Sequence, residues 1–272
     1  MRFTTRPELA GTFGMVSSTH WLASAAGMAM LEYGGNAFDA AVAAGMVLQV
    51  AEPHLNGPGG DLPLLIYPNT EQRVRVICGQ GTAPAQATIA HYQSLGLDLV
   101  PGTGLLATVV PGAFDAWMRM LQDYGTLHFE EVMKPALHYA ENGVPVLPRV
   151  RDTIAQVQPL FETEWTTSAA VYLLNGQIPQ HNTLLRNPVL AETWKRLIRE
   201  AQAEGPDRAQ QIEGARNAFY QGFVAEAIDQ FCRTQEVMDT SGERHRGVLI
   251  GEDMARWSAT YEEPVTLDYH GH

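Results

Sequence analysis

The sequence predicts a mixed α+β fold, and three of its features support this prediction. Residues 37–51 are apolar at nearly every position, which is typical of a helix that is buried on all sides. Two short β-type runs follow at 62–67 and 74–78, and the Pro-Asn-Thr-Glu-Gln stretch between them is a hairpin signature. From residue 130 onward the pattern is mostly helical, with loops between the helices. A few strands beside many helices are therefore expected.

The first predicted elements are a short strand at 14–18 and a helix at 21–33 that a glycine ends. The buried helix 37–51 follows at once, with Asn36 as its N-cap and Asp39 three residues further on. We interpret Asp39 as a cap or a buried hydrogen-bond partner, not as a catalytic acid.

A glycine-rich turn, Asn-Gly-Pro-Gly-Gly-Asp, connects the buried helix to the hairpin, and His54 stands just before it. Two roles suit His54: a place near an active site, or a structural histidine bonded to the backbone, which is the role we favour. The later predicted elements are a helix at 88–95, a strand at 105–110, and helices at 112–124, 130–141, 188–203 and 222–231.

Composition argues against several classes of function. The 30 acidic and 18 basic residues give a net charge of −12, whereas a nucleic-acid binder needs a basic face. No uncharged apolar run is long enough to cross a membrane, so no membrane partner is expected. The N-terminal residues lack the apolar core of a signal peptide, and the expected location is the cytoplasm.

Cysteine and histidine spacing gives no sign of a metal or redox site. Cys78 and Cys232 are far apart in the sequence, and we expect both to be free thiols. The 9 histidines form no paired ligand pattern, so neither a metal nor another cofactor is expected. The 272 residues suit one large domain or two small ones.

Residues 14–67 read GMVSSTHWLASAAGMAMLEYGGNAFDAAVAAGMVLQVAEPHLNGPGGDLPLLIY. This stretch resembles the opening of the γ-glutamyltranspeptidase family, which includes cephalosporin acylases, with the glycines, Asp39 and the Glu-Pro-His triplet at 52–54 in register. The segments 185–205, 218–228 and 247–265 resemble later family segments in the same order. The resemblance therefore covers essentially the whole chain and implies a single domain, 1–272, that forms most of a family large subunit.

The resemblance also implies a fold and a mechanism. The fold is the four-layer α/β/β/α sandwich of the N-terminal nucleophile hydrolases, completed by a second chain, the small subunit of the same precursor. In this family the precursor cuts itself, and the new N-terminal threonine of the downstream piece is the nucleophile, with its own amino group as the base. No catalytic residue is then expected in this chain. The implied reaction is acyl transfer from a small-molecule amide through an acyl-threonine intermediate.

Gln80, Gly81 and Thr82 are the candidate substrate-binding residues. The γ-glutamyl transferases have an Arg-Glu-x-Ala-Pro motif at this place, whose arginine pairs with the α-carboxylate of the glutamyl group. This sequence has Gln80-Gly81-Thr82 followed by Ala-Pro, and a neutral amide does not replace the charge of a guanidinium. The alternative role of Gln80 is to cap the end of a strand.

The resemblance leaves three functions open. The family default is hydrolysis or transfer of γ-glutamyl compounds such as glutathione. The glutamine at position 80 favours instead a cephalosporin-acylase-like amidase that is not specific for γ-glutamyl groups. The third reading is a non-catalytic relative that keeps the fold as a scaffold. The sequence of the second chain distinguishes the last reading from the first two, since a catalyst needs the N-terminal threonine.

Overall fold

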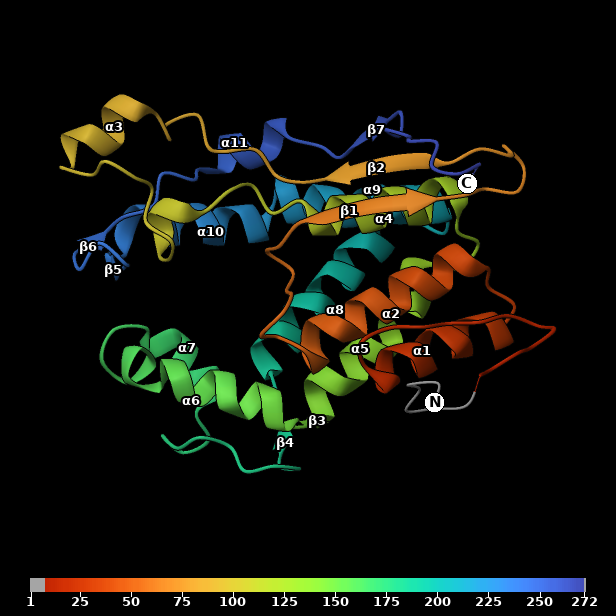
Figure 1. The fold of residues 1–272 in the computed structure, drawn as a ribbon, viewed down its shortest axis with the longest axis horizontal. Helices are drawn as coiled ribbons and strands as arrows, with labels where there is room; N and C mark the ends of the chain where they lie inside the picture. Colours follow the sequence, from red (N-terminus) through yellow and green to blue (C-terminus); the bar gives the residue numbers. More distant parts are fainter. Residues whose placement is uncertain (1–7, 272) are drawn as a thin grey trace.

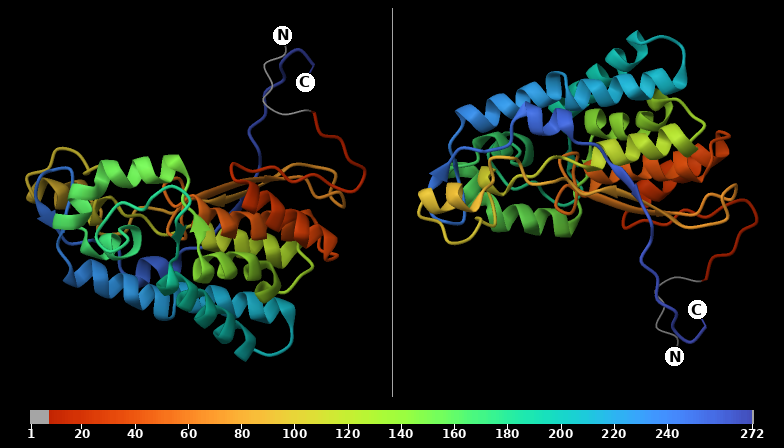
Figure 2. Two further views of the ribbon diagram at one scale, coloured as in Figure 1. Left: turned by 90° about the horizontal axis from the view of Figure 1, so that it is seen from below. Right: turned by 90° about the horizontal axis from the view of Figure 1, so that it is seen from above.

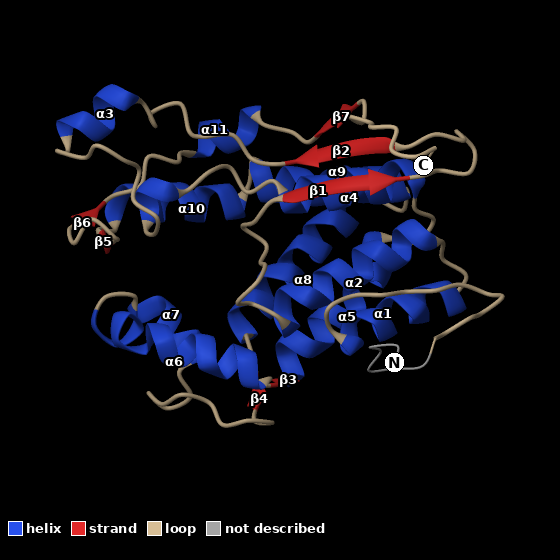
Figure 3. Cartoon of the chain, in the orientation of Figure 1, coloured by secondary structure: helices blue, strands red, loops and turns tan. Residues whose placement is uncertain are grey.

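The computed structural model describes residues 8–271, and helices make up most of it (Figure 3). A small antiparallel sheet lies along one edge of the helices (Figure 1), so the α+β class is confirmed. The elements, in chain order, are α1 Trp21–Glu32, α2 Ala37–Ala51, β1 Leu62–Ile66, β2 Arg75–Gly79, α3 Ile89–Ser94, the 3-10 helix η1 Leu105–Ala107, α4 Ala113–Tyr124, α5 Phe129–Asn142, β3 Val144–Pro145, α6 Pro148–Thr163, α7 Thr166–Tyr172, β4 Leu184–Leu185, α8 Pro188–Ala203, α9 Arg208–Tyr220, α10 Phe223–Thr234, β5 Val237–Met238, β6 Arg244–His245, α11 Gly251–Arg256 and β7 Thr260–Glu262.

Helix α2 is the element on which the core is built, because it packs against α1, α4 and α5 and is mostly buried. The Asn36 side chain caps it by accepting hydrogen bonds from the N–H groups of Phe38 and Asp39, at 2.9 and 3.2 Å. The buried Asp39 carboxylate accepts from the N–H groups of Asn36 and Thr126, at 2.8 and 2.9 Å. The interpretation of Asp39 as a cap and buried hydrogen-bond partner is therefore confirmed.

The sheet has the strand order β1-β2-β7, and all its neighbours are antiparallel. Leu64 pairs with Ile77, which pairs in turn with Tyr261, so these side chains share one face. Helix α4 packs on that face, where Ile77 is fully buried. A Cβ on Gly79 would lie 2.5 Å from the Cβ of Ala116 in α4, so helix and sheet are in very close contact there.

The opposite face of the sheet is uncovered within the described chain. Strand alternation places Leu65, Val76, Cys78 and Thr260 on this face. Leu65 is 74% exposed, and Val76 and Cys78 are only partly buried. Figure 2 shows the helices on one side of the sheet, with the N-terminal stretch and an extended C-terminal segment beyond the other. We call this surface the open sheet face. Its apolar side chains are typical of a surface that another layer covers.

Helices α6 and α7 form a smaller lobe with an apolar cluster of its own, at the lower left of Figure 1. Two contacts tie this lobe to the β5–β6 hairpin. The indole Nε1 of Trp165 donates to the carbonyl of Met238 at 2.9 Å, and Arg244 pairs with Glu164 at 2.8 Å. These two contacts therefore fix the position of the lobe relative to the β5–β6 hairpin.

The strand predicted at 14–18 is absent. This segment runs across α1 and α2, and Val16 packs so closely on α1 that a Cβ on Gly27 would lie 2.8 Å from its Cγ1. No other strand of residues 8–271 pairs with it. The prediction was wrong because β-type residues form a strand only where a partner edge is available.

The strand predicted at 105–110 is absent as well. Residues 105–107 form the 3-10 helix η1, and the three residues after it belong to no strand. One backbone hydrogen bond joins this stretch to the segment after β2, from the Val110 N–H to the Thr82 carbonyl at 3.0 Å. Pro111, which lacks an N–H, follows directly and prevents a longer ladder.

Candidate functional site

The segment after β2, where the sequence predicts substrate contacts, is held closely by its neighbours. The N–H of Gly81 donates to the Asp61 carboxylate at 3.3 Å, and the Thr82 carbonyl accepts from Val110. A Cβ on Gly81 would lie 1.6 Å from the Val110 carbonyl oxygen. Only glycine permits such an approach of two backbone segments. Gly81 is therefore required for packing, whatever else the segment does.

Gln80 projects from this segment with an exposed side chain. It has the strand parity of Cys78, and its Oε1 lies 4.0 Å from the Cys78 Sγ, so it extends along the open sheet face. No hydrogen bond joins the Gln80 side chain to the backbone of residues 8–271, and a strand-capping role gains no support. Thr82 is also exposed. The amide of Gln80 is therefore free to contact a molecule on the open side, and substrate binding there stays a prediction.

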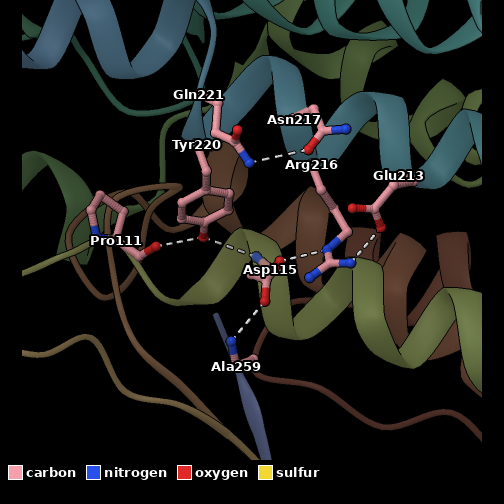
Figure 4. A network of polar contacts seen from close by, with 8 residues as sticks. All are labelled: Pro111, Asp115, Glu213, Arg216, Asn217, Tyr220, Gln221 and Ala259. Atoms are coloured by element: carbon pink, nitrogen blue, oxygen red, sulfur yellow. Dashed lines mark hydrogen bonds and ion pairs between the residues drawn. The ribbon is translucent and has the colours of Figure 1, made fainter. Parts of the chain in front are cut away.

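A buried polar network supports the chain behind Gly81 (Figure 4). The Tyr220 hydroxyl donates to the Pro111 carbonyl at 2.5 Å and accepts from the Asp115 N–H at 3.1 Å. The Asp115 carboxylate accepts from the Nε of Arg216 at 2.6 Å and from the N–H of Ala259 at 2.7 Å. One carboxylate thus joins α4, α9 and the chain that enters β7.

The ion pair of this network is buried, and so is the Tyr220 hydroxyl. Asp115 is 2% exposed and Arg216 is 15% exposed, so water screens their ion pair poorly. Burial, and then the charge of Asp115, raise the pKa of Tyr220, and its hydroxyl keeps its proton for the bond to Pro111. The network was missed by sequence analysis, because Asp115 and Arg216 stand about a hundred positions apart and carry no shared motif.

His54 does not have the backbone bond that the sequence suggested. Both of its ring nitrogens are buried, and neither has a hydrogen-bond partner among residues 8–271. Burial lowers the pKa of His54 more than the charge of Glu52 raises it. Glu52 is itself buried and accepts a hydrogen bond from the Thr19 hydroxyl. The favoured role was therefore wrong in its bonding, since the two buried ring nitrogens have no backbone partner among the described residues.

The described chain offers few other features of a site. In residues 8–271 no helix combines the length and apolarity that a bilayer span requires. The same residues include no group of His, Cys, Asp and Glu side chains placed to hold a metal ion. Cys78 and Cys232 are both free, the first partly buried and the second buried.

A helical layer on one face of a sheet and a bare apolar face opposite is the geometry of one half of an α/β/β/α sandwich. The family model described as gamma-glutamyltranspeptidase matches residues 23–272. The chain belongs to this family, as its sequence pattern predicted.

Particular relatives show which activities occur on this scaffold. The glutathione hydrolase-like YwrD proenzyme of Bacillus subtilis (strain 168) is 33% identical over 266 residues, which are 96% of this chain and 45% of the relative. The solved structure described as LmbA2991HD is 60% identical with a TM-score of 0.95, over 99% of this chain and 46% of that one. A cephalosporin acylase from Bacillus halodurans is 27% identical with a TM-score of 0.79, over 100% of this chain and 48% of that one.

Two conclusions follow from these comparisons. The expected fold of the N-terminal nucleophile hydrolases is confirmed for the layers that this chain supplies. The chain spans about half the length of the curated relatives it matches, and the curated relative is named a proenzyme.

Proposed function

We propose that this chain is the large-subunit part of an amide hydrolase or acyltransferase, and that a second chain from the same precursor supplies the nucleophilic threonine. The threonine oxygen bonds to the acyl carbon as the C–N bond breaks, and the amine leaves with the hydroxyl proton. Water, or an acceptor amine, then attacks the acyl-threonine ester. The acid or new amide is released, and the threonine hydroxyl recovers a proton.

The observation that carries this proposal is the open sheet face with Gln80 at its end. Helix α4 covers the other face, so a ligand that reaches Gln80 approaches from the open side. A second sheet stacked on Leu65 and Val76 would bury them and leave the Gln80 amide at the border between the two chains. A threonine from the second chain can then meet a substrate beside Gln80.

The C-terminal segment gives independent support for a partner chain. Val265, Leu267 and Tyr269 alternate with polar residues and are all largely exposed. Alternation of this kind is typical of a strand with one buried face, yet no strand of residues 8–271 pairs with the segment. Figure 2 shows it running away from the body of the fold. A second chain that supplies a sheet edge would satisfy both its backbone and its apolar side chains.

The substrate class depends on Gln80. γ-Glutamyl amides, glutathione among them, are the first candidates. The family model is described as gamma-glutamyltranspeptidase, and the curated relative is named glutathione hydrolase-like. The second candidate is an amide whose acyl group has no α-carboxylate, as a cephalosporin-acylase-like enzyme would take. The neutral, exposed side chain of Gln80 favours this second class, since it cannot form the ion pair that a carboxylate prefers.

Gln80→Arg tests the role of this residue in the complete two-chain protein. If Gln80 occupies the carboxylate-reading position, the new charged hydrogen bond should raise kcat/KM for γ-glutamyl-p-nitroanilide roughly 10- to 100-fold. Acyl anilides without an α-carboxylate should gain nothing. Gln86→Arg, which adds the same charge at an exposed position further along the loop, is the matched control. An unmodified enzyme that already prefers γ-glutamyl substrates, with that preference unchanged in Gln80→Arg, would show that Gln80 does not read the carboxylate.

A further inference from the structure

The Asp61 carboxylate lies beside Gln80 at the end of the β1–β2 hairpin. The register of the two strands pairs Leu62 with Gly79, so the next positions outward are Asp61 and Gln80. Figure 1 shows the start of β1 and the end of β2 at the same end of the sheet. Residues directly opposite each other in an antiparallel pair have Cβ atoms roughly 4.5–5.5 Å apart. The side chains of Asp61 and Gln80 can therefore contact the same small molecule.

Asp61 faces the side on which the second chain is expected. It has the strand parity of Leu65, which places it on the open sheet face, and it is exposed. The hairpin residues that share this face are Asp61, Pro63, Leu65, Val76, Cys78 and Gln80. Asp61 is the charged residue among them. It therefore gives a negative charge to the end of the open sheet face where Gln80 lies.

One oxygen of this carboxylate has a contact within the chain, and the other is available to a ligand. Oδ1 accepts a hydrogen bond from the Gly81 N–H at 3.3 Å. In the described part of the chain, Oδ2 has no donor and no basic side chain pairs with Asp61. A second sheet stacked on Leu65 would also remove Asp61 from water, where an unpaired charge is unfavourable. Asp61 therefore needs a positively charged partner in the complete protein.

We propose that Asp61 is a specificity-determining residue, and that it binds an ammonium group on the acyl part of the substrate. The proposal rests on the proposed amide hydrolase function and specifies its substrate class. The position opposite Gln80 brings this ammonium to the group that contacts the Gln80 amide. A substrate carboxylate at the same place would be repelled by Asp61 and would find no cation in Gln80. The preferred acyl group therefore carries an amine and no α-carboxylate.

Four p-nitroanilides separate the two charges of a γ-glutamyl group. The γ-glutamyl compound carries an ammonium and a carboxylate, the 4-aminobutyryl compound only the ammonium, the glutaryl compound only the carboxylate, and the butyryl compound neither. In the complete two-chain protein, kcat/KM for the 4-aminobutyryl compound should exceed that for the butyryl compound roughly 10- to 100-fold, the effect of one charged hydrogen bond. The glutaryl compound should be cleaved less well than the butyryl compound.

Two variants separate the charge of Asp61 from its contact with Gly81. The amide of Asp61→Asn can still accept the Gly81 N–H, whereas Asp61→Ala loses both the charge and the contact. Both variants should reduce the ratio of 4-aminobutyryl to butyryl kcat/KM roughly 10-fold or more, and both should raise the ratio of glutaryl to butyryl. A purely structural role would change all these rates alike and leave the two ratios as they were. Asp98→Asn, which removes the same charge from an exposed position in the loop after α3, is the matched control and should alter neither ratio.

The other outcomes count against the proposal. Equal kcat/KM for the 4-aminobutyryl and butyryl compounds, or ratios that do not change in Asp61→Asn, would overturn the role of Asp61 and leave the amide hydrolase function standing. Failure to cleave any of the four compounds would count against the proposed function itself, and against the role of Asp61 with it. Loss of the second chain from purified Asp61→Asn, but not from Asp98→Asn, would show that Asp61 pairs with a cation of that chain and would also overturn the proposal. Should neither Asp61 variant fold, the comparison of the four compounds with the unmodified protein still decides whether an ammonium is preferred.

Discussion

Asp115→Ala is expected to lower the free energy of unfolding by about 3–5 kcal/mol, because it removes the buried partner of the Arg216 guanidinium and leaves only the half-exposed Glu213 beside it. The pair is nearly removed from water, with exposed fractions of 2% and 15%. The substitution also removes the acceptor of the Ala259 N–H, so the chain that enters β7 is loosened. The measurement is a urea unfolding curve of the complete protein.

An exposed ion pair provides the control for this prediction. Arg196 and Glu200 pair at 2.7 Å on the surface of α8, and Glu200→Ala should cost about 0.5 kcal/mol or less. The double variant Asp115→Ala/Arg216→Met should recover part of the loss, since it removes the charge that has lost its buried partner. If Asp115→Ala cost no more than Glu200→Ala, the buried network would not hold α4, α9 and β7 together.

Gly81→Ala is expected to destabilise the protein by about 1–3 kcal/mol or more and to reduce its activity. The added Cβ would lie 1.6 Å from the Val110 carbonyl oxygen, which is backbone and cannot turn aside. One of the two segments must shift, and the shift moves Gln80 as well.

The control is Gly57→Ala, because a Cβ on Gly57 meets nothing within 4 Å. Its effect on the unfolding free energy should stay within about 0.5 kcal/mol. Equal stability and equal kcat/KM for Gly81→Ala and Gly57→Ala would contradict the close approach that the structure shows at Gly81.

Local signals were enough to place most of the helices from sequence. The start of α8 was predicted at residue 188, and in the structure the Asn187 side chain accepts from the Leu190 N–H at 3.0 Å, with Pro188 in the first turn. The Asn36 cap of α2 was predicted in the same way. Caps and first-turn prolines act within one helical turn, so the neighbouring residues determine them.

The strands were harder to predict than the helices, because a strand needs a pairing partner that can lie far away in the sequence. The hairpin β1–β2 was predicted because its strands are close together in the chain, whereas β7 pairs with β2 from a distant part of the sequence and was missed. The run 105–110 has β-type residues but no edge to join, and it forms η1 and a loop. Pairing in the folded structure, and not residue composition, therefore determines which of these runs form strands.

The candidate site, like the strands, was predictable only in part. Gln80 was found because a family motif marks its position, and the structure adds that its side chain extends along the open sheet face. The Asp115 network was not predictable, since it joins distant parts of the chain.

We propose that a second chain completes this fold and carries the reacting threonine. The direct test is denaturing mass spectrometry of the protein, expressed from its whole reading frame and briefly incubated with an amide substrate. We expect a second polypeptide that begins with threonine and gains the mass of the acyl group on that residue. A partner chain that begins with another residue and takes up no acyl group would indicate the non-catalytic scaffold. A stable, monodisperse 29.8 kDa monomer without any partner chain would show that no second chain completes the fold.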